Sequence, residues 1–185
     1  CAGIRPLDAL NWSWSAMGVG VLATLPPFAL FLLFFRWPVG PLRPIRSIVI
    51  DMLGPPLAAC RWYDLVLLGA MAGFCEEVLF RGFLQAWLAG DDLAHPRSLG
   101  FLVALVGSNL LFALAHPVTR TYAVLAGLIG CYLGLLPLLD IDPETHAGNL
   151  VIPVVTHGLY DVLAFFVVAR VVKSGKWEVG SGEDH

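Results

Sequence analysis

Long apolar stretches alternate along the chain with short segments rich in proline, glycine and charged residues. The apolar stretches cover residues 12–35, 63–88, 99–116, 122–139 and 150–172. Crossing the hydrocarbon core of a bilayer takes roughly 20 predominantly apolar residues in a helix. Because a helix satisfies its own backbone hydrogen bonds in lipid, the pattern predicts an all-α, polytopic membrane bundle of about five transmembrane helices.

The segments between these spans carry the signals that end helices. Residues 36–61 hold five prolines and four arginines, so we predict a basic, proline-rich cytoplasmic linker that is mainly a solvated loop. Within it, residues 45–53 are apolar enough to form a short helix at the membrane interface. Residues 173–185 form a polar tail. No composition shift or repeat divides the chain, so residues 1–185 are expected to be a single membrane domain.

Proline and glycine add two local expectations. Pro26 and Pro27 fall in the middle of the first span and should kink it, because proline cannot donate a backbone hydrogen bond. Gly130 and Gly134 lie on one face of the fourth span, at the spacing that lets two helices approach closely. An acidic loop follows at residues 140–148.

The distribution of Lys and Arg predicts the orientation, because short cytoplasmic loops carry more of them. With the 36–61 linker inside, only Arg5 and Arg97 lie outside. Eight basic residues are then cytoplasmic: Arg36, Arg43, Arg46, Arg61, Arg120, Arg170, Lys173 and Lys176. We therefore predict a multi-pass protein of the cell (inner) membrane, with the N-terminus out and the C-terminus in.

Composition supports a membrane protein and excludes other classes. Hydrophobic residues make up 58% of the chain, whereas a soluble domain has roughly 45–50%. The net charge of −3 gives no indication of nucleic-acid binding. The four cysteines have neither the pairing of a disulfide framework nor the spacing of a zinc site. Because the chain begins at Cys1 rather than Met, we expect a fragment or a processed product.

Charged residues inside the second span are the strongest functional signal, since charge in a membrane helix is costly. Glu77 and Arg81 are four residues apart, so they lie on one helical face and can form a structural ion pair. Glu76 is rotated by about 100° from Glu77 and has Phe80 at its own i+4 position. An unpaired carboxylate at this depth binds a proton more readily than one in water, as a general base must.

Two other spans contribute imidazoles. His116 closes the third span, and alone it is more often an interfacial residue than a catalytic one. His157 and Asp161 are four residues apart on the fifth span, where Asp161 can hold one imidazole nitrogen and fix the tautomer. Counted along the helices, Glu76, His116 and His157 all fit the middle or cytoplasmic half of the bilayer. A shared cavity that opens towards the cytoplasm is therefore geometrically possible.

These residues resemble the three motifs of the CAAX-protease and bacteriocin-processing family, also called the Abi family. Order, spacing and placement in successive helices are all similar, and the resemblance covers roughly residues 62–170. The motifs are Glu76-Glu77-x-x-x-Arg81, Phe112-x-x-x-His116 and His157-x-x-x-Asp161.

The resemblance implies an intramembrane endopeptidase whose catalytic helices lie in residues 62–172. By the family pattern, Glu76 and His116 would activate the attacking water. His157 and Asp161 would stabilise the oxyanion, and Glu77 and Arg81 would support the site. We expect no metal and no other cofactor. The expected partners are membrane lipid and a peptide or protein substrate, with no nucleic acid.

The sequence departs from part of the family at Asp161, where the eukaryotic and archaeal prenyl-protein proteases typically have Asn. An ionised Asp cannot donate a hydrogen bond, so Asp161 would instead orient His157. Asp is found in the bacterial branch, which the sequence resembles more, and this counts against a prenylated CAAX substrate. Bacteriocin-like peptides and lipidated or sorted membrane proteins are the substrate classes that remain.

The residues leave three alternatives open. Glu and His side chains could hold zinc in a metalloprotease, although no His-Glu-x-x-His is present. A scaffold could keep the polar cluster for packing or substrate capture. A proton-coupled transporter also uses buried Glu and His, but usually has inverted repeats, which this chain lacks. Cys75 lies about 100° from Glu76 on the helix without a nearby base in the sequence, so we interpret it as a packing residue.

Overall fold

The computed structural model describes residues 5–141 and 148–175, and within them it consists of helices and connecting turns without a β-strand. This confirms the predicted all-α class. Most of the predicted acidic loop and polar tail, residues 142–147 and 176–185, lie outside the described residues, as does Cys1.

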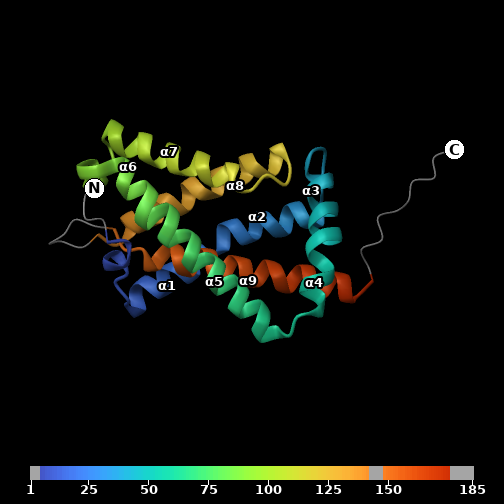
Figure 1. Ribbon diagram of the computed structural model, residues 1–185. Helices are drawn as coiled ribbons and strands as arrows, with labels where there is room; N and C mark the ends of the chain where they lie inside the picture. The colour runs from blue at the N-terminus through green and yellow to red at the C-terminus, as the bar shows by residue number, and fades with distance from the viewer. Residues whose placement is uncertain (1–4, 142–147, 176–185) are drawn as a thin grey trace.

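The helices carry the labels of Figure 1, with η for short 3₁₀ or π-helical segments. Two runs are continuous: α3, η2 and α4 follow one another directly, as do α5, η3 and α6. In chain order the elements are η1 Pro6–Ala9, α1 Trp14–Ala23, α2 Leu25–Arg36, α3 Leu42–Ile48, η2 Val49–Leu53, α4 Gly54–Ala59, α5 Trp62–Glu77, η3 Val78–Gln85, α6 Ala86–Ala89, η4 Gly90–Ala94, α7 Leu99–Leu114, α8 Arg120–Leu135, η5 Leu136–Leu139 and α9 Val151–Lys173.

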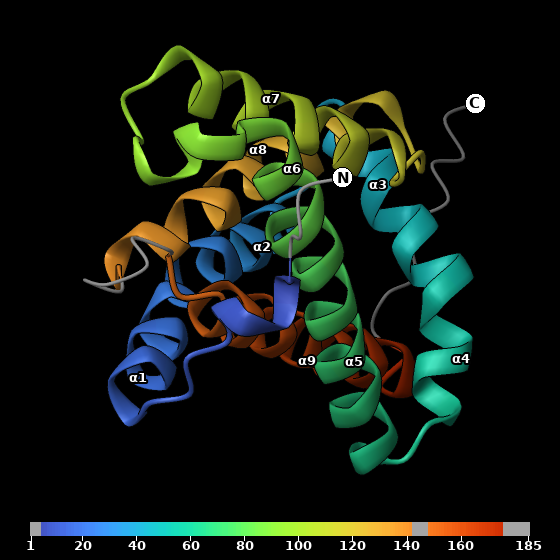
Figure 2. The same ribbon diagram turned by 60° about the vertical axis from the view of Figure 1, so that its left-hand side comes forward.

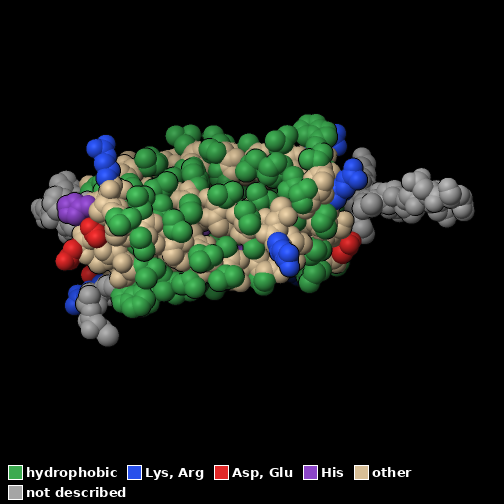
Figure 3. All heavy atoms as spheres, turned by 90° about the horizontal axis from the view of Figure 1, so that it is seen from above, with side chains coloured by type: hydrophobic (Ala, Val, Ile, Leu, Met, Phe, Trp, Pro, Cys, Tyr) green, Lys and Arg blue, Asp and Glu red, His purple; other side chains and the backbone are tan. Residues whose placement is uncertain are grey.

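The surface and the helix lengths are those of a membrane bundle. Three helical segments are long and apolar enough to cross a bilayer, namely Trp14–Arg36, Arg120–Leu139 and Val151–Lys173, and Leu99–Leu114 is apolar but shorter. In Figure 3, hydrophobic side chains cover the middle of the molecule and charged ones gather mainly towards its two ends. The predicted membrane bundle is confirmed, and the direction in which it crosses the membrane stays a prediction.

The first span is interrupted close to its two prolines. Helix α1 ends at Ala23 and α2 begins at Leu25, with Pro26 in the first turn of α2, where a missing N–H costs least. Thr24 stands between them, and its hydroxyl is within hydrogen-bond distance of two carbonyl oxygens, Gly20 O at 3.0 Å and Thr156 O at 3.3 Å. The interruption is therefore anchored to α9.

The linker is more ordered than the sequence predicted. Residues 42–59 form the continuous helix α3–η2–α4, where we expected mainly a solvated loop with a short helix at 45–53. The difference has a packing origin, because this helix has a buried apolar side. Ile50 is buried, and Leu57 joins Val168 and Ala169 of α9 in a core cluster.

Helix α9 is the central element of the bundle. It packs against α1, α2, α4, α5 and α8, and α5 crosses it in both Figure 1 and Figure 2. The buried apolar side chains lie around it in two clusters, one near its N-terminal end with Val151 and Ile152 and one near its C-terminal end with Val168 and Ala169.

The crossing of α5 and α9 is made by backbone rather than by side chains. A Cβ atom built on Gly73 would lie 2.6 Å from Gly158 Cα, and one built on Gly69 would lie 2.7 Å from Val162 N. Contacts this short leave no room for a methyl group. The two helices can therefore approach closely only because glycines occupy the crossing, as in other small-residue membrane interfaces.

A buried arginine joins three further elements. Arg81 of η3 donates from Nη1 to Glu77 Oε1 at 2.8 Å, which is the ion pair predicted from the i, i+4 spacing. Its Nη2 donates to Asn109 Oδ1 of α7 at 2.8 Å and to the Gly130 carbonyl of α8 at 2.7 Å. One side chain thus ties the α5–η3 helix to α7 and α8.

Glycines on α8 make this polar contact possible. A Cβ atom on Gly130 would collide with Asn109 Oδ1, and one on Gly134 would lie 2.7 Å from Gln85 Oε1. Gln85 repeats the contact one turn further along, donating from Nε2 to the Gly134 carbonyl at 3.0 Å. The close approach predicted from the spacing of Gly130 and Gly134 is confirmed. The side chains that come close to these glycines include the polar ones of Arg81, Gln85 and Asn109.

Substitution of the crossing glycine should loosen the bundle. We expect Gly73→Ala to lower the free energy of unfolding by about 1–3 kcal/mol, because the new methyl group forces two backbones apart. Denaturant titration in mixed micelles measures the change. Gly18→Ala is the matched control, since a Cβ on Gly18 meets nothing within 4 Å. Equal effects of the two substitutions would contradict this account.

Removal of the buried arginine should be more damaging. We expect Arg81→Met to lower the free energy of unfolding by about 3–5 kcal/mol, because it leaves the charge of Glu77 buried without its cation. The double variant Glu77→Gln/Arg81→Met should recover part of the loss. The control is Arg5→Met, which breaks an exposed 4.0 Å contact with Asp8 and should cost little. A small loss of stability in Arg81→Met would argue against a buried charge pair. So would a double variant whose loss equals the sum of the losses of the two single variants.

Candidate active site

Three helices bring one carboxylate and two imidazoles to the same place. Glu76 is at the end of α5, His116 follows the last turn of α7, and His157 is in α9. Glu76 Oε2 lies 3.8 Å from His116 Nε2 and 3.9 Å from His157 Nε2. The predicted residues therefore face each other across one small space, although they lie far apart in the sequence.

Glu76 is held in this space without a direct hydrogen bond. Among the described residues its Oε2 atom is buried and has no hydrogen-bond partner, while the side chain as a whole is 32% exposed. Separations of 3.8 and 3.9 Å to the two imidazoles are too long for direct hydrogen bonds. They suit a small polar group, such as a water molecule, placed between the three side chains.

The ring of His116 is oriented by its own helix. Its Nδ1 lies 2.8 Å from the Phe112 carbonyl, one turn earlier. A carbonyl oxygen can only accept, so Nδ1 carries the hydrogen and donates it. Nε2, which faces Glu76, therefore has a free lone pair in the neutral imidazole. The ring also lies against Phe112, with centroids 4.5 Å apart.

The ring of His157 is oriented by Glu77 of a different helix. His157 Nδ1 lies 2.7 Å from Glu77 Oε1, the same oxygen that accepts from Arg81. Glu77 is fully buried, and the glycine crossing places it against α9. A carboxylate accepts, so Nδ1 donates, and Nε2 is turned towards Glu76.

Asp161 and Glu77 lie beside different nitrogens of the His157 ring. We expected Asp161 to hold one imidazole nitrogen and fix the tautomer, but the hydrogen bond to His157 Nδ1 comes from Glu77. Asp161 Oδ2 lies 3.6 Å from His157 Nε2, on the side that faces Glu76. The contact between Glu77 and His157 could not be predicted from the sequence, because Glu77 belongs to α5 and reaches His157 only where α5 crosses α9.

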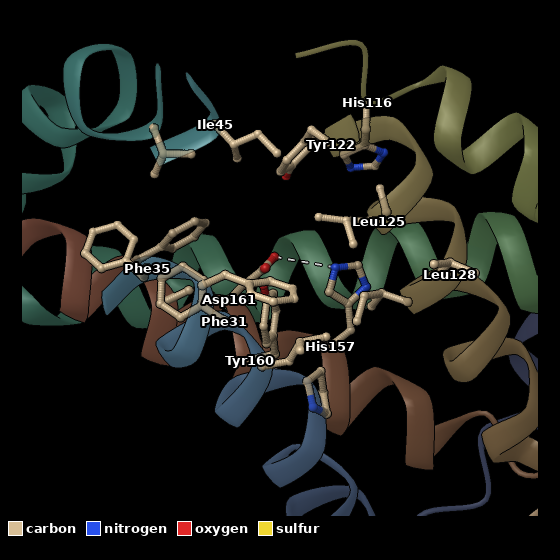
Figure 4. Close-up of a pocket in the computed structure, with 18 of the residues that line it drawn as sticks. Phe31, Phe35, Ile45, His116, Tyr122, Leu125, Leu128, His157, Tyr160 and Asp161 are labelled. Carbon is tan, nitrogen blue, oxygen red and sulfur yellow. Dashed lines mark ion pairs between the residues drawn. The ribbon is translucent and has the colours of Figure 1, made fainter. Parts of the chain in front are cut away.

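These groups line part of a cavity of about 650 Å³ between α2, the α3–η2–α4 helix, α5, α7, α8 and α9. Glu76, His116, His157 and Asp161 all line it. Figure 4 shows His157 and Asp161 beside one another, with His116 across from them and phenylalanines beyond Asp161. Most of the remaining lining is apolar. The polar groups are thus a minority in the lining of a largely hydrophobic cavity.

The sequence analysis missed several aromatic residues of the site. Phe112 packs edge-on to Phe80 at 4.9 Å between centroids and lies under the guanidinium of Arg81 at 4.7 Å. Tyr122 and Tyr160 line the cavity close to the polar groups, as Figure 4 shows. Aromatic residues are so common in membrane helices that their spacing alone gives no signal. Phe112 stood out only as the first residue of its motif.

The arrangement is suited to proton transfer at a bound water molecule. It combines a carboxylate without a cation of its own and two imidazoles with defined tautomers, all beside an apolar cavity. Within residues 5–141 and 148–175, no group of three His, Cys, Asp or Glu side chains has an arrangement that could hold a metal ion.

Comparison with known proteins agrees with the motifs. No curated protein and no solved structure matches the chain. A family model described as type II CAAX prenyl endopeptidase Rce1-like matches residues 58–163, which is more than half of the chain and includes Glu76, His116, His157 and Asp161. The chain therefore belongs to the Rce1-like family of type II CAAX prenyl endopeptidases, whose members are intramembrane proteases.

Proposed function

We propose that the protein is a metal-independent, glutamate-type intramembrane endopeptidase of the cell (inner) membrane. The observation that carries the proposal is the meeting of Glu76 Oε2 with two imidazole Nε2 atoms, at 3.8 and 3.9 Å, on the wall of an apolar cavity. Two imidazoles that each turn one nitrogen towards the same carboxylate suit the activation of a water molecule between them.

The first step is attack by water. A water molecule between Glu76 and His116 donates one hydrogen bond to each, since Glu76 Oε2 and His116 Nε2 both offer a lone pair. As the water oxygen forms its bond to the scissile carbonyl carbon, its proton moves to Glu76. His116 fixes the second hydrogen and so directs the attacking lone pair.

The second requirement is a donor for the negative charge that develops on the carbonyl oxygen. His157 supplies it from Nε2 as the imidazolium, which Glu77 stabilises by accepting the Nδ1 hydrogen at 2.7 Å. The protonated Glu76 then gives its proton to the leaving nitrogen, and the C–N bond breaks. The products are a carboxylic acid and an amine, which become a carboxylate and an ammonium group when the second water proton passes from one to the other, and Glu76 returns to its starting state.

Asp161 has an electrostatic role in this scheme. Its Oδ2 is 3.6 Å from His157 Nε2, so its negative charge favours the imidazolium before the substrate binds. An ionised carboxylate cannot itself donate to the oxyanion. Asp161 is therefore not the second oxyanion donor that the family pattern would suggest, and His157 carries that task.

The substrate in this proposal is a membrane-associated peptide or protein, such as a lipidated or bacteriocin-like one. The mostly apolar lining of the cavity suits a segment that arrives from the lipid and carries apolar side chains. The family description adds the CAAX sequence at a C-terminus as a substrate to test first. Nothing in the charge of the chain suggests a nucleic acid.

Loss of the base should abolish cleavage. We expect Glu76→Gln to reduce hydrolysis of a prenylated CAAX peptide in proteoliposomes by about 10²–10⁴-fold, because the amide cannot accept the proton of the water. Thermal unfolding of the variant should match that of the wild type. Full activity of Glu76→Gln would refute the mechanism.

Two controls separate this mechanism from its alternatives. Cys75→Ala should remain active, because Cys75 is exposed on the surface and is not part of the cavity lining. Incubation with a chelator should leave the wild-type rate unchanged. Inactivation by the chelator with recovery on adding zinc would instead support a metalloprotease.

His157 and Asp161 should respond differently to substitution. We expect His157→Ala to lower kcat by about 10²–10³-fold, because it removes the donor. Asp161→Asn should lower kcat by less than His157→Ala, because it removes a charge that favours the imidazolium while Glu77 still holds His157 and the asparagine amide can donate. Steady-state kinetics on one substrate measures both. A large loss for Asp161→Asn would show that the charge of Asp161 matters more than its donor capacity.

A further inference from the structure

The proposed reaction has one assigned hydrogen-bond donor for the oxyanion, the Nε2 atom of His157. Asp161 lies beside that nitrogen, with Oδ2 at 3.6 Å, but an ionised carboxylate cannot donate. Oxyanions in acyl transfer are usually stabilised by several preorganised donors together. A second donor would come from another polar group of the cavity lining.

Several donors of the lining are already committed within the protein. The Thr156 hydroxyl lies 2.9 and 3.0 Å from two carbonyl oxygens. The Tyr132 hydroxyl donates to the Ala23 carbonyl at 2.8 Å. Arg46 has its guanidinium carbon 5.4 Å from the centroid of the Phe35 ring. Each of these three side chains is thus engaged by another part of the protein.

Two tyrosine hydroxyls of the lining, those of Tyr122 and Tyr160, have no hydrogen-bond partner within residues 5–141 and 148–175. A buried tyrosine hydroxyl usually finds a partner, so an unused one in a cavity is available to a bound molecule. Tyr160 has its ring edge against Phe31, at 6.1 Å between centroids, on the aromatic side of the cavity.

Tyr122 is the tyrosine beside the proposed reaction. It lies in the first turn of α8, and its ring centroid is 6.3 Å from that of His116. The negative charges of Asp161 and Glu76 both act on its hydroxyl. Figure 4 shows the side chain reaching into the cavity beside His116, with its oxygen on the side of Asp161. The hydroxyl thus faces the same space as His157, from a different helix.

We propose that the Tyr122 hydroxyl is the second hydrogen-bond donor to the oxyanion, a task that Asp161 cannot perform. This assignment rests on the proposed function. As the scissile carbonyl carbon becomes tetrahedral, its oxygen accepts one hydrogen bond from His157 Nε2 and one from the Tyr122 O–H. The phenol keeps its proton throughout, so the proton transfers between water, Glu76 and the leaving nitrogen are unchanged. A donor that meets only the developing charge raises kcat rather than substrate affinity.

Kinetics of the full chain in proteoliposomes tests the assignment. We expect Tyr122→Phe to lower kcat for a prenylated CAAX peptide by about 10²-fold, because one oxyanion donor is lost. KM should stay within about threefold of the wild-type value, because the hydroxyl contributes little to binding of the ground state. The midpoint of thermal unfolding should not change, because within the described residues the hydroxyl has no partner to lose.

Tyr132→Phe is the matched control. It removes a hydroxyl from the same helix and the same cavity, but one that donates to the Ala23 carbonyl. Pro27, four residues after Ala23, has no N–H with which to serve that carbonyl in its place. We expect Tyr132→Phe to lower the midpoint of thermal unfolding and to keep the wild-type kcat.

Binding of a transition-state analogue separates a donor to the oxyanion from a role in packing. The probes are the same peptide and three phosphinates of it, each with a tetrahedral anionic phosphorus group at one of the three peptide bonds after the prenylated cysteine. All bind to the full chain with Glu76→Gln in nanodiscs, which prevents turnover. We expect one phosphinate to bind more tightly than the peptide. Adding Tyr122→Phe should weaken that phosphinate roughly 10- to 100-fold and leave the affinity for the peptide unchanged.

The outcomes separate the donor from the proteolytic function. A wild-type kcat in Tyr122→Phe would overturn the proposal, as would equal weakening of phosphinate and peptide. A loss of kcat in Tyr160→Phe with none in Tyr122→Phe would move the donor to α9 and overturn it as well. If the wild type cleaves no peptide while a phosphinate still binds through the Tyr122 hydroxyl, the donor stands and the proposed function fails. If no phosphinate binds more tightly than the peptide, the assignment of Tyr122 fails, whatever the rate of hydrolysis.

Discussion

One oxygen atom, Oε1 of Glu77, holds the site together. It accepts from Arg81 on its own helix and from His157 on α9, and it is fully removed from solvent. Arg81 passes the connection on to α7 and α8 through Asn109 and the Gly130 carbonyl. A charge in this place is costly unless every partner is present, so helix packing and imidazole orientation depend on the same contact.

The neighbouring glutamates have different surroundings, because adjacent residues of a helix point in directions about 100° apart. Glu77 turns towards the crossing with α9, where charge is neutralised and fixed. Glu76 turns towards the cavity, where its oxygen meets two imidazoles but has no direct hydrogen bond within the described residues. Two adjacent carboxylates thus lie in different surroundings, one buried in an ion pair and one on the cavity wall.

The sequence predicted what depends on spacing within one helix and missed what depends on contact between helices. The pairing of Glu77 with Arg81 followed from i, i+4 geometry, and the grouping of Glu76, His116 and His157 followed from motif order and depth. The contact between His157 and Glu77 was not predicted. It depends on Gly73 and Gly158, which bring α5 within reach of α9, and neither glycine forms a motif. The α3–η2–α4 helix was expected to be a loop, since its prolines and arginines hid the apolar side that packs on α9.

The bare backbone contact between α5 and α9 also limits how such a protein can change over evolutionary time. Where two main chains touch, a larger side chain does not fit, so we expect the spacing of the groups fixed by that contact to change little. The aromatic and aliphatic lining from α2, α3 and α8 has no such restriction. New substrate preferences should therefore arise on that lining, while the chemistry stays the same.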